Sequence, residues 1–268
     1  MSDLPAWPDL AVGAEGAVAE VRLNRPAARN AFSQSLMRQL IEAAAWLRAS
    51  TEIQAVIVAG AETYFSAGAD LADPERAAER PATRIERRQA ARLGPDLCAA
   101  WESLEQVTIA AIEGYCIGGA AALAVSLDFR IAGVGAYLRL PEIALGMNMS
   151  WGALPRITAL VGPSRAKQFA IFCEPCPAEE ALAWGMVDEV VATGAALARS
   201  RAWAAKVAAL PPLPVRMTKE AINAQAGALH RATSAMDRDQ WMLTSETGDF
   251  AEGGRAFAQK RKPTFRGD

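Results

Sequence analysis

A pair of glycines, Gly118 and Gly119, lies within the sequence GYCIGGAAALA (114–124). The residues that follow the pair in this stretch, AAALA, have no ionisable side chain. The pair is predicted to lie between a buried strand and a helix. Free N–H groups in the first turn of a helix, together with the helix dipole, attract negative charge. The chemistry available here is therefore hydrogen bonding from the backbone. The alternative is a tight connection without a functional role.

A second loop has the same form. FSAGADL (65–71) follows the apolar run AVIVAG (55–60) and offers small residues and a glycine where a strand is expected to end. The N–H groups of Ala69 and Gly119 could both point at one oxygen atom, and two such donors make an oxyanion hole. The alternative is a plain loop in which Asp70 caps a following helix.

A single glutamate, Glu142, follows Pro141 in the mainly apolar segment LPEIALG (140–146). A glutamate in the first turn of a helix often only complements the helix dipole. If apolar neighbours remove the carboxylate from water, its pKa rises and it becomes suited to general acid or base chemistry. The residues alone leave both interpretations open.

The sequence lacks the motifs of several other classes of active site. There is no GxxxxGK[ST] and no G-x-G-x-x-G, so neither a P-loop nor a dinucleotide site is predicted. There is no G-x-S-x-G, Ser150 lies in NMSWG, and the one histidine, His230, lies among polar residues of the tail. Cys173 and Cys176 form a C-x-x-C without a second pair, so no metal site is predicted.

The elements that must position these residues alternate between strand and helix. Strands are predicted at 17–23, 55–60, 107–114, 129–133 and 186–191, and helices after Ser33 and at 84–104, 120–127 and 178–185. This alternation predicts an α/β architecture with largely parallel pairing. From Ala195 onward only helical patterns occur, so an α/β core (1–194) and a helical region (195–268) that packs on the core or on a neighbouring subunit are expected.

Composition limits the partners and the compartment. The formal net charge of -2 gives no overall field that would attract nucleic acid. The N-terminal segment lacks the basic and apolar regions of a secretory signal, and the longest apolar run is far short of the roughly 20 residues that cross a bilayer. We therefore predict a cytoplasmic protein that binds neither nucleic acid nor membrane.

Together these motifs resemble the enoyl-CoA hydratase/isomerase (crotonase) superfamily. FSAGADL, EGYCIGGAAALA, LPEIALG, EEALAWGMVDEVV and EGGRAFAQKRKPTF occur in that family's order and spacing, and LNRPAARNAFS is similar to its first motif. The resemblance covers nearly the whole chain. It implies a crotonase-like spiral of ββα units followed by a helical trimerisation region, and hence a homotrimer or a dimer of trimers.

The resemblance also implies a substrate, an acyl-coenzyme A thioester, and no separate cofactor, because coenzyme A is part of that substrate. The carbonyl oxygen would lie between the N–H groups of Ala69 and Gly119, and Glu142 matches a catalytic glutamate of the family. The remaining implied contacts are with coenzyme A. They involve the loop residues Ser66, Ala67, Gly68, Asp70 and Leu71, and also Phe257 and Lys260, which match positions that commonly reach the nucleotide from a neighbouring subunit.

Two departures from the family pattern bear on the reaction. Ala122 stands where members with two catalytic glutamates carry the first of them. The segment 149–153 replaces a Pro-Gly-x-Gly-Gly stretch and brings Ser150 and Trp151 to the expected wall of the acyl pocket. Trp151 either narrows that pocket or only packs in it. Ser150 either contacts water or substrate, or caps a helix.

One carboxylate suffices to move a double bond, because a single base can remove a proton and return it nearby. Hydration usually divides its work between two carboxylates. We therefore expect a Δ3,Δ2-type enoyl-CoA isomerase with Glu142 as the proton shuttle. The alternatives are a hydratase in which Glu142 and Ser150 position water, and a non-catalytic acyl-CoA-binding scaffold.

Overall fold

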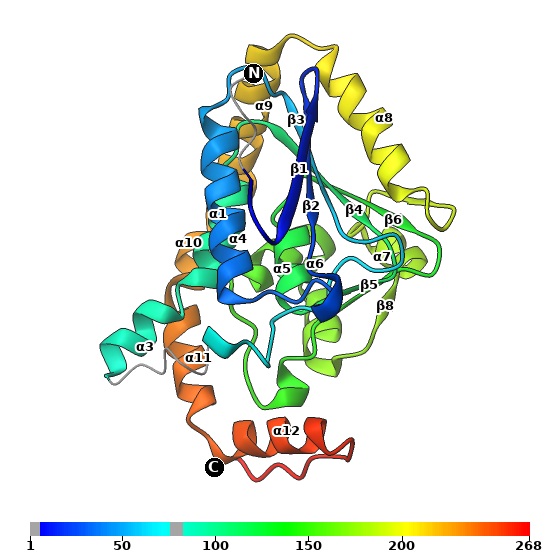
Figure 1. Cartoon of the computed structure of the whole chain (residues 1–268). Coiled ribbons are helices and arrows are strands. Elements are labelled where there is room, and N and C mark those ends of the chain that lie inside the picture. The colour runs from blue at the N-terminus through cyan, green and yellow to red at the C-terminus, as the bar shows by residue number, and fades with distance from the viewer. Residues whose placement is uncertain (1–5, 76–82) are drawn as a thin grey trace.

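The computed structural model describes residues 6–75 and 83–268, and their centre is a twisted six-stranded sheet (Figure 1). β1 pairs antiparallel with β2, and every following pair in the sheet is parallel. This confirms the predicted α/β class with largely parallel pairing. The strand order is β1 (Leu10–Glu15), β2 (Val18–Leu23), β3 (Ala55–Ala59), β4 (Val107–Ile112), β6 (Phe129–Gly133) and β9 (Glu189–Val191).

A second, three-stranded sheet escaped the sequence analysis because its strands have only two or three residues, too few to show a period. It consists of β5 (Tyr115–Ile117), β7 (Tyr137–Arg139) and β8 (Cys176–Pro177). β5 lies between β4 and the glycine pair, so the pair does not follow the long strand directly. A parallel bridge between Ser66 and Cys116 ties this sheet to the FSAGADL loop.

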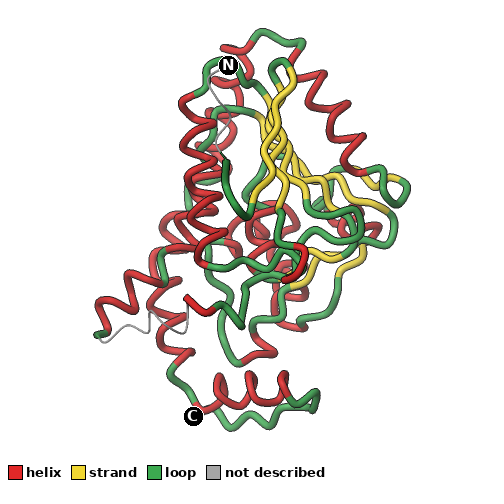
Figure 2. The backbone as a smooth tube through the Cα atoms, in the orientation of Figure 1, coloured by secondary structure: helices red, strands yellow, loops and turns green. Residues whose placement is uncertain are grey.

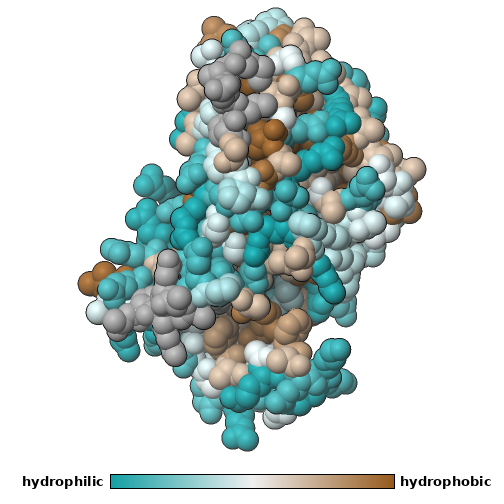
Figure 3. All heavy atoms as spheres, in the orientation of Figure 1, coloured by the Kyte–Doolittle hydropathy of each residue, from teal (hydrophilic) through white to brown (hydrophobic). Residues whose placement is uncertain are grey.

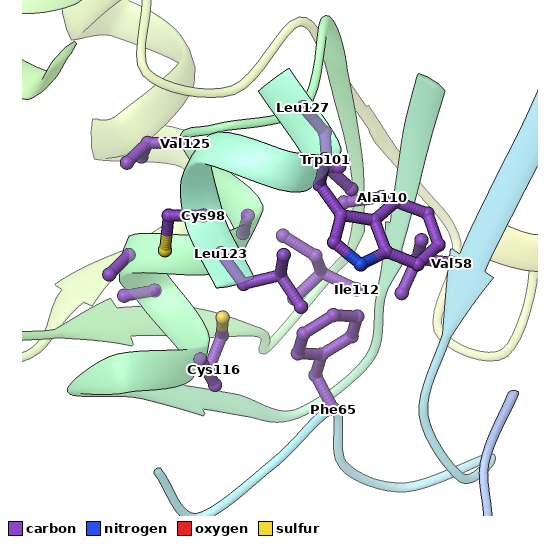
Figure 4. Packing of buried hydrophobic residues seen from close by; sticks show 14 of the residues in the cluster. Val58, Phe65, Cys98, Trp101, Ala110, Ile112, Cys116, Leu123, Val125 and Leu127 are labelled. Atoms are coloured by element: carbon purple, nitrogen blue, oxygen red, sulfur yellow. The ribbon is translucent and has the colours of Figure 1, made fainter. Parts of the chain in front are cut away.

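Helices cover both faces of the large sheet (Figure 1). On one face lie α1 (Gln34–Ala49), α4 (Leu93–Glu102), α5 (Gly119–Ala124) and α6 (Ala153–Phe172), and on the other lies α8 (Ala196–Ala208). The Ser33 hydroxyl caps α1 by accepting a hydrogen bond from the Leu36 N–H, where the sequence places the start of this helix. Figure 4 shows Trp101 and Phe65 packed in the core beside Leu123 of α5. The core therefore fixes the helix that follows the glycine pair.

The single long helix predicted at 84–104 is wrong. The structure has α3 (Arg84–Ala90) and, after a break, α4, which begins at Leu93. Pro95 explains the break, because its ring would collide with the carbonyl of residue 91 in a continuous helix. Ile85 of α3 is 71% exposed, so this short helix does not bury an apolar face in the core. α3 instead contacts α11 through Arg88, which forms an ion pair with Asp239.

The C-terminal region is helical, as Figure 2 shows for the lower part of the molecule. The division at residue 194 stays a prediction, since α8, directly after it, packs on the large sheet. The other elements are η1 (Pro26–Ala28), η2 (Ile143–Leu145), α7 (Ala178–Trp184), α9 (Pro212–Ala226), α10 (His230–Thr233), η3 (Ser234–Met236), α11 (Asp237–Ser245) and α12 (Gly248–Ala258). Within the described residues, no helix is both long and apolar enough to cross a membrane.

Candidate active site

A cavity of about 750 Å³ lies where the two predicted loops meet. Its walls include Ala69, Gly119 and Glu142. Helix α12 contributes Gly253, Ala256 and Phe257 to the opposite side. Figure 3 shows apolar surface gathered directly above α12, at the edge of this site. The structure thus brings together the three residues for which chemistry was predicted.

The two loops touch through their glycines. Gly68 has φ of +86°, and a Cβ atom there would lie 2.5 Å from the carbonyl oxygen of Ile117 and 3.7 Å from the Cα atom of Gly118. Only glycine allows this backbone conformation and this approach. The residues that precede Ala69 and Gly119 are therefore in contact, so the two candidate donors lie close together.

Both candidate N–H groups are free to bind a ligand. A parallel bridge joins Phe32 to Ala69, and its hydrogen bonds use the Gly68 carbonyl, at 2.7 Å, and the Asp70 N–H, at 3.0 Å. The Ala69 N–H takes no part in this bridge. Gly119 is the first residue of α5, where an N–H has no partner within the helix. Neither group donates a hydrogen bond to another part of the described chain.

Glu142 lies against the glycine pair. Gly118 has φ of +56°, and a Cβ atom there would lie 2.8 Å from Glu142 Oε1, so glycine is required both by the backbone and by the carboxylate. Glu142 Oε2 is buried and has no hydrogen-bond partner in the described part of the protein. Burial raises the pKa of Glu142 to about 7, although its own backbone N–H and Arg139 act in the opposite direction.

The other carboxylates that line the cavity have partners. Asp70 forms an ion pair with Arg25 at 3.0 Å and accepts a hydrogen bond from the Ala72 N–H. Asp73 accepts a hydrogen bond from the Gln34 N–H at 2.8 Å. Among the described residues, Glu142 is thus the one carboxylate of the cavity with an oxygen left for a substrate proton. Asp70 caps no described helix.

Ala122 does not reach the cavity. Its side chain is fully buried within the core, and it is not among the residues of the cavity wall. Ser150 and Trp151 do line the cavity. The alternative role of Ser150 as a helix cap is wrong, because the N-cap of α6 is Gly152 and no side chain caps it.

The residues predicted to bind coenzyme A divide into two groups. Ala67, Gly68, Asp70, Leu71 and Phe257 line the cavity. Ser66 instead fixes the loop, since its buried hydroxyl donates to the Asn30 carbonyl at 2.7 Å and accepts from the Gly68 N–H at 3.1 Å. Lys260 is exposed and lies outside the cavity wall, which contains the neighbouring Arg261.

Sequence reasoning missed several residues of the cavity. Gly94 and Arg139 come from segments that carry no motif, and Phe32 lies in the first motif without a role having been assigned to it. The double glycine was noted, but nothing in the sequence shows that Gly118 makes room for Glu142. Within the described residues, no cluster of His, Cys, Asp and Glu side chains could hold a metal ion.

Similarity to known proteins extends over nearly the whole chain. Residues 13–268 match the model of a family described as enoyl-CoA hydratase/isomerase. The chain belongs to the enoyl-CoA hydratase/isomerase family. Among its relatives in this family, a 2,3-dehydroadipyl-CoA hydratase of Escherichia coli is 33% identical over 97% of this chain and 99% of its own length. A short-chain-enoyl-CoA hydratase of Clostridium acetobutylicum is 32% identical over 92% of this chain and 94% of its own length.

Solved structures of the family share the fold. An enoyl-CoA hydratase from Mycobacterium avium subsp. paratuberculosis superposes with a TM-score of 0.87 at 26% identity, over 97% of this chain and 100% of that one. An enoyl-CoA hydratase from Bacillus anthracis superposes with a TM-score of 0.76 at 31% identity, over 97% and 100%. The predicted crotonase-like fold and the membership of an acyl-CoA-processing enzyme family are confirmed.

Proposed function

We propose that the protein moves a carbon–carbon double bond of an enoyl-CoA thioester from the β,γ to the α,β position. Glu142 removes a proton from the carbon next to the thioester carbonyl and returns it further along the acyl chain. The N–H groups of Ala69 and Gly119 hold the oxygen of the enolate that forms in between. Coenzyme A arrives as part of the substrate, and the proton transfer uses no other cofactor.

A single observation carries this proposal. Glu142 is the one carboxylate in the described cavity wall that keeps an unpartnered oxygen, and Ala122, where a second acid would stand, is buried out of reach. Proton removal and return need one base, whereas hydration must both activate water and protonate carbon. A pKa of about 7 suits both halves of a proton shuttle near neutral pH.

Hydration of a 2-enoyl-CoA is the second candidate, and two observations favour it. The relatives described above are named as hydratases. Ser150 lines the cavity, and its hydroxyl forms no hydrogen bond within the described residues, so it is available to position a water molecule for Glu142. In this mechanism Glu142 would activate the water and also deliver the proton to carbon.

A substrate panel separates the candidates. Purified protein is assayed with saturated, 2-enoyl, 3-enoyl and 3-hydroxyacyl-CoA esters, and the binding of each ester is measured by calorimetry. Isomerisation predicts turnover of the 3-enoyl ester with little water added to the 2-enoyl ester. Ready hydration of crotonyl-CoA with no shift of the 3-enoyl ester would select the second candidate. Binding of the esters without any turnover would indicate a scaffold protein.

The pH dependence of the isomerisation follows from Glu142. Its carboxyl must be deprotonated to act as the base, and its pKa is raised to about 7. We therefore expect kcat/KM for a 3-enoyl-CoA to fall about tenfold per pH unit below this value and to reach a plateau above it. Initial rates between about pH 5 and pH 9, with circular dichroism to confirm folding, test this. A flat profile would remove Glu142 as the titrating base.

We also propose that the protein assembles as a homotrimer or a dimer of trimers through its C-terminal helices. Lys219 is the one buried residue of α9, whereas Leu213, Met217 and Ile222 on this helix are each at least 60% exposed. Large apolar side chains exposed together on one helix are typical of an interaction site. Light scattering should give three or six times the mass of 28.4 kDa. A monomer at micromolar concentration would contradict this, and Ile222→Glu should weaken the assembly.

A further inference from the structure

The cavity wall beside Gly119 contains a tryptophan in an unusual backbone conformation. Trp151 has φ of 64°, and Gly152 after it has φ of 63°. The left-handed region is unfavourable for a bulky side chain, and such a conformation persists only where the surroundings impose it. Other groups must therefore hold this turn in place.

A charged network behind the cavity provides these groups. Nη1 of the buried Arg156 donates to the carbonyl oxygens of Trp151 and Gly152, each at 3.0 Å. Asp237 Oδ2 accepts a hydrogen bond from the Gly152 N–H at 2.8 Å. Glu102 in turn binds the Arg156 guanidinium through two hydrogen bonds of 2.8 and 2.7 Å. A two-point contact of this kind fixes the guanidinium, so the carbonyls it binds are fixed as well.

Two glycines make room for the indole. A Cβ atom at Gly94 of α4 would lie 2.0 Å from Trp151 Cε2, and one at Gly119 would lie 2.5 Å from Cη2. Neither glycine has a positive φ, so the backbone does not require glycine at either position. Glycine inside a helix is less favourable than alanine, and at Gly94 the space that the indole occupies explains why glycine is present. The Phe32 ring stacks on the indole, and the two ring centroids are 6.3 Å apart.

We propose that Trp151 determines substrate specificity by closing the acyl end of the cavity, so that only short acyl-CoA esters fit. This inference rests on the proposed function, because it takes the thioester oxygen to lie at Ala69 and Gly119. The indole contacts the turn that carries the Gly119 N–H. It lies against Gly94 of α4 and against Gly119 at the start of α5. An acyl chain that continues past this turn meets the indole. One methylene group in a tight pocket changes kcat/KM by about 10- to 200-fold.

The decisive variant is Trp151→Gly, which removes the indole and suits the left-handed backbone. We measure kcat/KM for butenoyl-, hexenoyl-, octenoyl- and decenoyl-CoA, each as the 2-enoyl ester (crotonyl-CoA for the butenoyl group) and as the 3-enoyl ester. In the wild type, kcat/KM should fall steeply as the acyl chain becomes longer. In Trp151→Gly the ratio for octenoyl over crotonyl esters should rise at least tenfold. Trp184→Leu, which removes an indole outside the cavity wall, should leave the length profile unchanged. The same dependence of kcat/KM on acyl-chain length in Trp151→Gly and in the wild type would overturn the proposal.

A double-mutant cycle with Gly94 separates pocket shape from general damage. Gly94→Ala places a methyl group where the indole lies and should push it into the acyl space, so that kcat/KM falls at least tenfold even for the shortest ester. In the Gly94→Ala/Trp151→Gly double variant this loss should disappear, because the indole is gone. Equal losses in both backgrounds would show that residue 94 acts independently of Trp151 and would count against the proposal.

Binding measurements keep this proposal distinct from the proposed function. Calorimetry with saturated butyryl-CoA and octanoyl-CoA needs no turnover. If no enoyl ester reacts but the wild type binds butyryl-CoA at least tenfold more tightly than octanoyl-CoA, and Trp151→Gly removes that preference, the proposed function fails and the role of Trp151 stands. If the wild type turns over or binds long and short esters equally well, Trp151 does not close the pocket.

Discussion

Glu142→Gln is expected to lower kcat for the shift of a 3-enoyl-CoA by about 10²- to 10⁴-fold, the usual contribution of a general acid or base. The amide keeps the size of the carboxyl and the fit against Gly118, where Oε1 lies within 2.8 Å of the position of an added Cβ atom. It cannot accept and return a proton, so the loss should fall on kcat and not on binding. Steady-state kinetics and calorimetry with a saturated ester measure the two effects.

Glu142→Asp is the matched control for this prediction. It retains the acid but moves the carboxyl away from Gly118, so we expect partial activity between that of the wild type and that of the glutamine variant. A glutamine variant with wild-type kcat would remove Glu142 from the mechanism. It would also remove the rationale for the pH profile, since no other carboxylate of the described cavity wall is left unpartnered.

Ala69→Pro is expected to lower kcat by about 10²- to 10³-fold, because it deletes one of the two proposed oxyanion donors. Proline removes the N–H group, but it also fixes φ of residue 69 at about −65° and restricts the backbone of Gly68 before it. The bridge to Phe32 uses the Gly68 carbonyl and the Asp70 N–H, so no backbone hydrogen bond is lost, and Ala69 has no positive φ. Kinetics with a 3-enoyl-CoA, together with circular dichroism, measure the effect.

Ala69→Ser provides the comparison for the proline variant, because it changes the side chain while keeping the N–H group. It should lose far less activity than Ala69→Pro. If the two variants were equally active, the Ala69 N–H would not stabilise the transition state, and the oxyanion would have to be held by Gly119 alone. A proline variant that no longer binds a saturated ester would indicate a distorted loop.

The sequence predicts the site well where each residue acts through its own motif. Loop sequences and apolar context mark Ala69, Gly119 and Glu142 as candidates, the family resemblance assigns them a role, and the structure places all three on one cavity. The long strands were predicted because β3 and β4 are continuous apolar runs, buried along their whole length. These features depend on local pattern, which a sequence displays directly.

Features that depend on contacts between distant segments could not be predicted. Gly94 and Trp151 are far apart in the sequence, and neither suggests that the indole fills the space above the glycine. β5 and β7 are too short to show a period, and they are strands because they pair with each other. The single helix predicted at 84–104 is wrong because the apolar spacing continues past Pro95, whereas the backbone does not. A proline at this position is incompatible with a helix that continues from residue 91, so α3 ends at Ala90 and α4 begins at Leu93.

The most direct test of the central claim is to follow the wild-type protein acting on 3-hexenoyl-CoA by two readouts, the ultraviolet absorbance of a conjugated enoyl thioester and the mass of the product. Single-glutamate isomerisation predicts 2-hexenoyl-CoA, with an unchanged mass and a double bond conjugated to the thioester. It also predicts that Glu142→Gln leaves the substrate intact. A product heavier by one water, or unreacted 3-hexenoyl-CoA beside rapid hydration of crotonyl-CoA, would contradict the account.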